Sequence, residues 1–157
     1  DGGDDDEIDI GGGDARRLDR ASRGLAGHSM GGHGALTLAL TYPDRFRSVS
    51  AFAPICNPTQ SDWGRKQFAA YLGDDAANWA AHDAVELIKA RGLALPLLVD
   101  QGAADKFLDL LQPQALEAAL AGTTGQLRWQ AGYDHSYFFV ASFMQDHITF
   151  HARALLA

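Results

Sequence analysis

Residues 24–36 read GLAGHSMGGHGAL, and this stretch decides how the rest of the chain is interpreted. Its first four residues are small and mostly apolar, as in a short buried strand, while residues 35–40 form an apolar run typical of a helix that Pro43 ends. Between the two lies Gly-His-Ser-Met-Gly, which fits the G-x-S-x-G pattern of a nucleophile elbow. The stretch therefore predicts a sharp strand-to-helix turn that presents the hydroxyl of Ser29.

Such a turn is needed because a serine hydroxyl is a poor nucleophile until a base takes its proton. The turn brings strand and helix so close that only small side chains fit beside the serine, which accounts for Gly27 and Gly31, with further clearance from Gly32 and Gly34. The peptide N–H of Met30 then lies at the start of the helix and is the candidate hydrogen-bond donor to an oxyanion. A glycine-rich turn that holds a serine by chance is the alternative interpretation.

Beyond this turn the chain alternates strands with helices, which favours a parallel sheet with helices on both faces. We expect four strands, the C-terminal portion of an α/β-hydrolase fold, in one domain without internal repeats. The expected strands are residues 24–27, 48–53, 95–100 and 126–130, and the expected helices are 35–40, 65–72, 83–92 with a capping box of Asp83 and Glu86, 113–122, and 136 to the C-terminus.

The partners of the serine follow from chain order, which in this fold is serine, then an acid, then histidine. His135 lies between the last expected strand and the last helix and is the candidate base. Asp105 follows the preceding strand and is the candidate acid that orients the imidazole. We prefer it to Asp100, which lies at the strand tip, to Asp109, which lies inside the following segment, and to Asp134, which is adjacent to the histidine.

Four other histidines have simpler interpretations. His28 and His33 flank the serine too closely in sequence to act as its general base, so we expect them to pack or to line the site. His147 and His151 are four residues apart, a spacing that suits a metal, but no third ligand is in view and we expect packed or surface residues. The sequence thus predicts no metal site at these histidines.

Composition narrows the class of protein. Removing the six acidic charges of residues 1–9 from the net charge of −7 leaves −1, so the body has no basic field for nucleic acid. We expect residues 1–17 to be a disordered acidic, glycine-rich head, which lacks the ligand spacing of a calcium loop, and residues 18–157 to be the partial hydrolase domain.

No apolar run suits a membrane span and no segment reads as a signal peptide. With Cys56 as the only cysteine, we expect a cytoplasmic protein.

Six separate motifs stand along the chain, at residues 27–36, 48–58, 63–73, 100–108, 132–137 and 146–148. Together, and in this order, they resemble the S-formylglutathione hydrolase family, also called esterase D. The resemblance implies a cytosolic thioesterase that hydrolyses S-formylglutathione to formate and glutathione, with no cofactor and possibly as a homodimer. It implies the triad Ser29, Asp105 and His135, and the chain departs from the family at Ala104, where a second acid is usual.

Family members are considerably longer, and the resemblance implies that the missing part is N-terminal. The second oxyanion donor of this fold comes from a loop after an early strand. Two alternatives to the thioesterase therefore stay open: a general carboxylesterase on small acyl esters, and a non-catalytic fragment that lacks the N-terminal half of the sheet and that donor.

Overall fold

The computed structural model describes residues 22–157, so the expected acidic head at residues 1–17 lies outside the described residues. The described part contains one four-stranded parallel sheet in the order β1-β2-β3-β4, which is also the order along the chain. The strands are β1 Gly24–His28, β2 Ser48–Phe52, β3 Leu97–Gly102 and β4 Gln126–Gln130.

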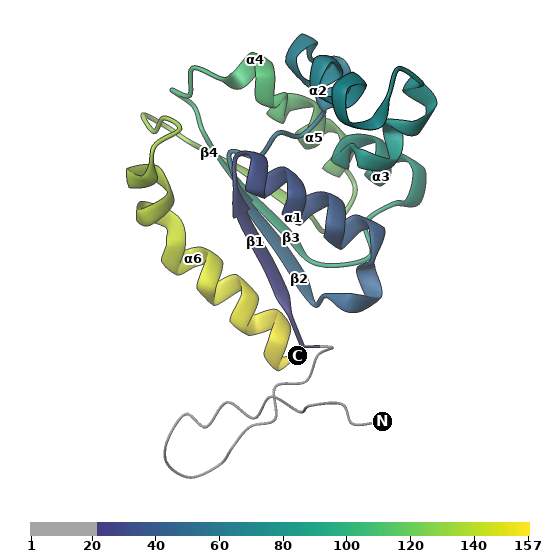
Figure 1. Ribbon diagram of the computed structural model, residues 1–157. Coiled ribbons are helices and arrows are strands. Elements are labelled where there is room, and N and C mark those ends of the chain that lie inside the picture. The colour runs from purple at the N-terminus through teal and green to yellow at the C-terminus, as the bar shows by residue number, and fades with distance from the viewer. Residues whose placement is uncertain (1–21) are drawn as a thin grey trace, which may run out of the picture.

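Helices cover both faces of this sheet, as Figure 1 shows. The α1, α3 and α5 helices pack together on one face, and α6 crosses the other face against β1, β2 and β3. The α helices are α1 Met30–Thr41, α2 Asp62–Leu72, α3 Ala84–Arg91, α4 Leu108–Leu111, α5 Pro113–Leu120 and α6 Tyr137–Leu156. Short 3₁₀ turns are η1 Pro43–Arg45, η2 Pro58–Gln60, η3 Ala76–Asn78 and η4 Ala80–His82.

The core encloses the two central strands along their whole length. Every residue of β2 and β3 is buried, because helices cover both faces of these strands. The larger apolar cluster fills the space between the sheet and α1, α3 and α5. A smaller cluster lies under α6, where the ring of Phe139 meets Phe52 edge-on at 5.9 Å. Both clusters hold the carboxyl ends of the strands in a fixed arrangement.

The expected α/β fold with four parallel strands and flanking helices is confirmed, with differences at the element ends. The β3 strand begins at Leu97, two residues later than expected, since Pro96 has no N–H for the ladder and instead accepts from the N–H of Val49. The expected capping box is only half formed. Asp83 accepts from the N–H of Glu86, but the Glu86 carboxylate pairs with Lys89 instead of returning to Asp83.

Two further points concern the helices. The α1 helix begins at Met30, five residues before the expected apolar run, because its glycines continue the helix from the turn. The α4 helix is a single turn, too short for a periodic pattern to reveal. Of the helices in residues 22–157, none combines the length and the apolar character that crossing a bilayer requires.

Candidate active site

The turn between β1 and α1 has the strained backbone that a nucleophile elbow requires. Ser29 has φ 57° and ψ −118°, a region that non-glycine residues rarely occupy. The turn is held by backbone hydrogen bonds on both sides of the residue: its N–H donates to the carbonyl of Phe52 at 2.9 Å, and its carbonyl accepts from the N–H of His33 at 3.0 Å. The hydroxyl is therefore fixed at the carboxyl end of the sheet.

Two glycines make the close approach of strand and helix possible. A Cβ on Gly27 would lie 2.2 Å from the carbonyl oxygen of Gly31, and a Cβ on Gly32 would lie 2.9 Å from the Cβ of Pro54. A Cβ on Gly31 or Gly34 would meet no such atom within 4 Å. The expectation that residue 31 has to be small is thus wrong. Residue 27 has to be a glycine because the backbone of Gly31 lies where a side chain at position 27 would be.

The structure brings the three predicted site residues into one hydrogen-bonded chain. Nε2 of His135 lies 2.9 Å from Oγ of Ser29, and Nδ1 of His135 lies 2.6 Å from Oδ2 of Asp105. Because a carboxylate only accepts, Nδ1 carries the hydrogen, which leaves Nε2 free to accept from the serine hydroxyl. This is the tautomer that a general base needs.

The loops that carry the acid and the histidine are bound to each other. The N–H of Ala103 donates to the carbonyl of Gln130 at 3.0 Å, and the N–H of Ala104 donates to the carbonyl of Tyr133 at 2.9 Å. A Cβ on Gly102 would lie 2.4 Å from that Tyr133 oxygen. Sequence reasoning missed this glycine, although its place at the end of a strand and before the acid was a signal of close backbone approach.

The other candidate acids lie in different surroundings. Asp109 is exposed in the first turn of α4, and the Asp134 carboxylate is exposed and accepts from the N–H of Ser136. Asp100 is fully buried and forms an ion pair with Arg128 instead of approaching the imidazole of His135.

A dense polar cluster surrounds Asp100. Its carboxylate accepts from both the Nε and the Nη2 of Arg128, from Nε2 of His147 at 3.1 Å and from the amide of Gln130 at 3.1 Å. Burial acts to raise the pKa of Asp100, but the hydrogen bonds from His147, Arg128 and Gln130 outweigh it and hold the pKa at about 2. The cluster ties α6 to β3 and β4 and so fixes the helix that follows the loop of His135.

The two histidines beside the elbow line the site, as the sequence predicted. The ring of His28 lies 4.7 Å from the ring of His135, and its Nε2 is buried without a partner among the described residues. Burial, and then the neighbouring His135, lower the pKa of His28, so its imidazole is neutral at neutral pH. His33 donates through Nδ1 to the carbonyl of Ile55 at 3.2 Å, and burial lowers its pKa.

The histidines of α6 are packed against the sheet. His147 stacks on Phe52 at 3.8 Å, and His151 lies within hydrogen-bond distance of the hydroxyls of Ser48 and Ser50, at 2.7 and 2.8 Å. Within residues 22–157, no three His, Cys, Asp or Glu side chains gather as a metal ligand set.

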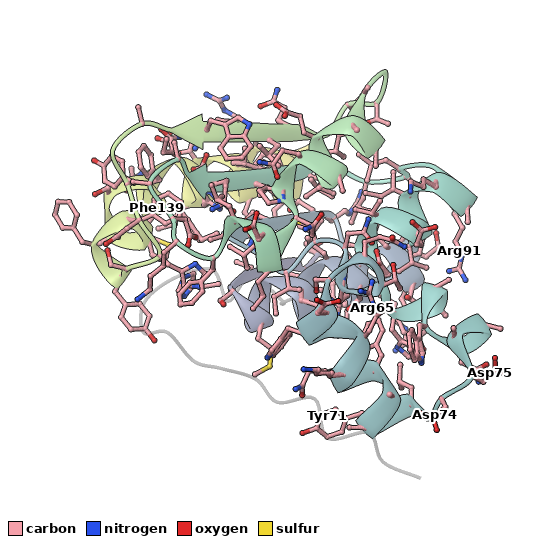
Figure 2. All side chains as sticks on the ribbon, turned by 90° about the horizontal axis from the view of Figure 1, so that it is seen from above. Arg65, Tyr71, Asp74, Asp75, Arg91 and Phe139 are labelled. Atoms are coloured by element: carbon pink, nitrogen blue, oxygen red, sulfur yellow. The ribbon has the colours of Figure 1, made fainter. Side chains whose placement is uncertain are left out.

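A small apolar pocket opens beside the turn. Met30, which is 69% exposed, begins α1, and within residues 22–157 its N–H donates to no carbonyl. The pocket has a volume of about 230 Å³, and at its rim Tyr71 projects away from the body of the molecule (Figure 2). Its lining residues are Met30, His33, Ile55, Pro58, Trp63, Gly64, Gln67, Phe68, Tyr71, Leu72 and His82.

Other side chains near the turn have different surroundings. Trp63 lines the pocket, and Tyr137 is exposed with its ring 5.7 Å from that of His28. Tyr133 packs against aromatic rings of α6, and Cys56 is buried, so that burial raises the pKa of its thiol. A thiol held in this protonated form is not a nucleophile.

Comparison with known proteins places these observations in context. Residues 13–150 match the family model described as "Putative esterase". Over 140 residues the chain is 62% identical to an S-formylglutathione hydrolase of Paracoccus denitrificans, covering 88% of this chain and 50% of that protein. It is 49% identical over 145 residues to an S-formylglutathione hydrolase of Mus musculus, covering 89% of this chain and 51% of that protein.

The fold is also similar to that of a solved structure. An S-formylglutathione hydrolase from Agrobacterium tumefaciens superposes with a TM-score of 0.83 at 46% sequence identity, covering 88% of this chain and 51% of that one. The chain thus spans about half the length of the curated relatives it matches.

Proposed function

The chain belongs to the esterase family that its residues 13–150 match, and from this premise we propose that it is a serine thioesterase that hydrolyses S-formylglutathione to formate and glutathione. The observation that carries the proposal is the hydrogen-bonded chain from Asp105 through His135 to Ser29. The likeness to relatives named S-formylglutathione hydrolase supports the substrate.

In the acylation step Oγ of Ser29 attacks the thioester carbonyl carbon while its proton passes to Nε2 of His135. Asp105 stabilises the imidazolium that forms and stays ionised. The carbonyl oxygen becomes an oxyanion, and the N–H of Met30, at the start of α1, donates to it. The carbon–sulfur bond then breaks, the sulfur takes the proton from His135, and a formyl ester remains on the serine.

In the second step water completes the cycle. His135 takes a proton from the water, whose oxygen attacks the formyl carbon, and the proton returns to Oγ of Ser29 as formate leaves. None of these steps uses the buried acid Asp100, whose oxygens are occupied by Arg128, His147 and Gln130.

One observation favours a second candidate, a general carboxylesterase on small acyl esters. The pocket beside Met30 is lined by apolar and aromatic side chains such as Trp63 and Phe68, and its volume of about 230 Å³ exceeds what a formyl group fills. Such a lining suits an apolar substituent on either side of the scissile bond.

The two activities are separated by comparing S-formylglutathione with p-nitrophenyl acetate on the purified chain. The proposal expects a kcat/KM for the thioester that clearly exceeds that for the acetate. A preference for the acetate would instead support the carboxylesterase. Absence of turnover and of an acylation burst on both substrates would identify the non-catalytic alternative.

Variants link any turnover to the site. Ser29→Ala is expected to lower kcat by at least about a thousandfold, since the nucleophile is lost. Ser61→Ala is the matched control, because that hydroxyl caps α2 through the N–H of Gly64 and lies outside the triad. Equal activity in both variants would exclude Ser29 as the nucleophile.

We also propose that the protein works in the cytoplasm and forms a homodimer, as the resemblance to the family implies. Cell fractionation and light scattering on the purified chain test the two points separately. Recovery from another compartment, or a monomeric mass at micromolar concentration, would contradict them.

A further inference from the structure

We propose that Gln101 is a positioning residue that fixes the orientation and the charge of the Asp105 carboxylate, and through it the hydrogen bond to His135. The inference rests on the proposed function, in which Asp105 orients the base. It concerns a residue that sequence reasoning did not single out, one strand position before the glycine that allows the two loops to meet.

The carboxylate of Asp105 is held from three sides. Its Oδ1 accepts from the N–H of Phe107 at 2.8 Å, and its Oδ2 accepts from Nδ1 of His135 at 2.6 Å. Oδ2 also accepts from Nε2 of Gln101 at 3.1 Å. The glutamine therefore shares the oxygen that holds the histidine, and its side chain is fully buried, so water does not compete for the contact.

The orientation of the Gln101 amide is determined by its neighbours. Its nitrogen faces two acceptors, Oδ2 of Asp105 and the carbonyl of Gly102 at 3.2 Å, so the nitrogen and the oxygen cannot be exchanged. The amide oxygen consequently points elsewhere, and it is buried with no hydrogen-bond partner among the described residues.

An unpaired buried oxygen destabilises a fold, and an apolar side chain such as methionine would avoid it. The amide is thus poorly explained by stability, and its distinguishing contact is the donated hydrogen bond to Asp105. A second donor on Oδ2 offsets part of the carboxylate charge and limits rotation of the carboxyl group. The carboxylate then stays ionised while the Nδ1 hydrogen remains on His135.

The test replaces Gln101 by methionine, which keeps the length and removes the donor. Gln112→Met is the control, because the amide of Gln112 also donates a hydrogen bond, to the carbonyl of Asp109 at 2.6 Å, and lies outside the site. The rate of Ser29 phosphonylation by a fluorophosphonate is measured from pH 5 to 9. The downfield NMR signal of the His135 Nδ1 hydrogen is recorded for both variants.

For Gln101→Met we expect phosphonylation to slow by about tenfold, as for loss of a hydrogen bond to a charged group. The acidic midpoint of its pH profile should move upward by about half a unit, because an uncompensated carboxylate favours the imidazolium. The downfield signal should also move, whereas Gln112→Met should leave all three measurements unchanged. Identical behaviour of the two variants, or a slower rate with an unmoved midpoint and an unmoved signal, would overturn the proposal.

A second variant covers the case in which methionine prevents folding. Gln101→Glu keeps the shape, donates one hydrogen bond to Asp105 while protonated and repels it once ionised. Its phosphonylation rate should fall further below that of the unmodified chain as the pH rises, and a constant ratio across the pH range would contradict the assignment. Neither the phosphonate nor the NMR signal involves S-formylglutathione, so failure of the thioesterase proposal remains distinguishable from failure of this one.

Discussion

Oγ of Ser29 and Nε2 of His135 lie 2.9 Å apart although 106 residues separate them in the chain. The serine is fixed by the turn at the end of β1, and the histidine by the loop between β4 and α6. The distance between the two atoms therefore depends on how the strands and loops around both residues pack. Substitutions in these strands and loops test the site.

The strained backbone at Ser29 gives the first prediction. Both Ser29→Ala and Ser29→Gly remove the hydroxyl, but only glycine adopts φ 57° and ψ −118° without steric strain. We expect the glycine variant to be more stable than the alanine variant by about 1 kcal/mol, measured by urea unfolding. Equal free energies of unfolding would mean that the turn stores no strain.

A second prediction compares two glycines of the elbow. Gly27→Ala places a Cβ 2.2 Å from the carbonyl oxygen of Gly31, so strand and helix have to separate, and we expect a loss of at least about 2 kcal/mol. Gly31→Ala meets open space inside α1 and should be neutral or stabilising by up to about 1 kcal/mol. Thermal unfolding of the pair checks the order, and a reversed order would show that the close approach lies elsewhere.

The third prediction concerns the contact between the two catalytic loops. Gly102→Ala directs a Cβ at the Tyr133 carbonyl, 2.4 Å away, and so pushes the loop of His135 from that of Asp105. We expect at least about a hundredfold loss of kcat, as for a misplacement of about 1 Å. Gly34→Ala, which meets open space, serves as the comparison and should retain activity.

A fourth prediction separates the acid of the triad from a nearby carboxylate. Asp105→Asn keeps the shape but no longer stabilises the required imidazole tautomer, and kcat should fall by about a thousandfold to ten-thousandfold. Asp109→Asn changes an exposed residue of α4 and should leave kcat within about twofold, because surface substitutions away from the site have little effect. Comparable losses in both variants would argue against Asp105 as the acid.

The buried ion pair on β3 predicts how stability depends on pH. Its partners hold the pKa of Asp100 at about 2, below the ordinary value of 3.8, so its contribution of about 2 kcal/mol is present above pH 4 and lost as the pH falls toward 2. Asp100→Asn should flatten the stability curve in that window. Asp146→Asn also loses a contact to Arg128, but at an exposed position, and should cost less than about 1 kcal/mol. Urea unfolding between pH 2 and 7 checks both, and an unchanged curve for Asp100→Asn would contradict the linkage.

Much of the fold was predictable because its signals are local. The apolar run within residues 95–100 identifies a buried strand, and the glycines around Ser29 identify the turn. Chain order then selected Asp105 and His135, since parallel strands bring their carboxyl ends to one edge of the sheet.

The remaining features depend on distant atoms that no local pattern reports. Nothing in the sequence around Gln101 indicates that its amide meets Asp105, because the contact requires the chain to turn back after β3. The pattern around Ser29 predicts that Gly32 gives clearance, but not that Pro54, on a different segment, is the residue that requires it. The sequence predicts that His147 is a packed or surface residue, but its contact with Asp100 follows only from the position of α6 across the sheet.

The order of the strands in the sheet repeats their order along the chain, and this affects how the protein is made. As the polypeptide leaves the ribosome, the nucleophile emerges first, the carboxylate second and the imidazole last. Under the proposed function, Ser29 therefore remains an ordinary alcohol until His135 has been added, and it acquires its reactivity only when β4 and α6 join the sheet. A nascent chain that stalls before residue 135 carries a harmless serine.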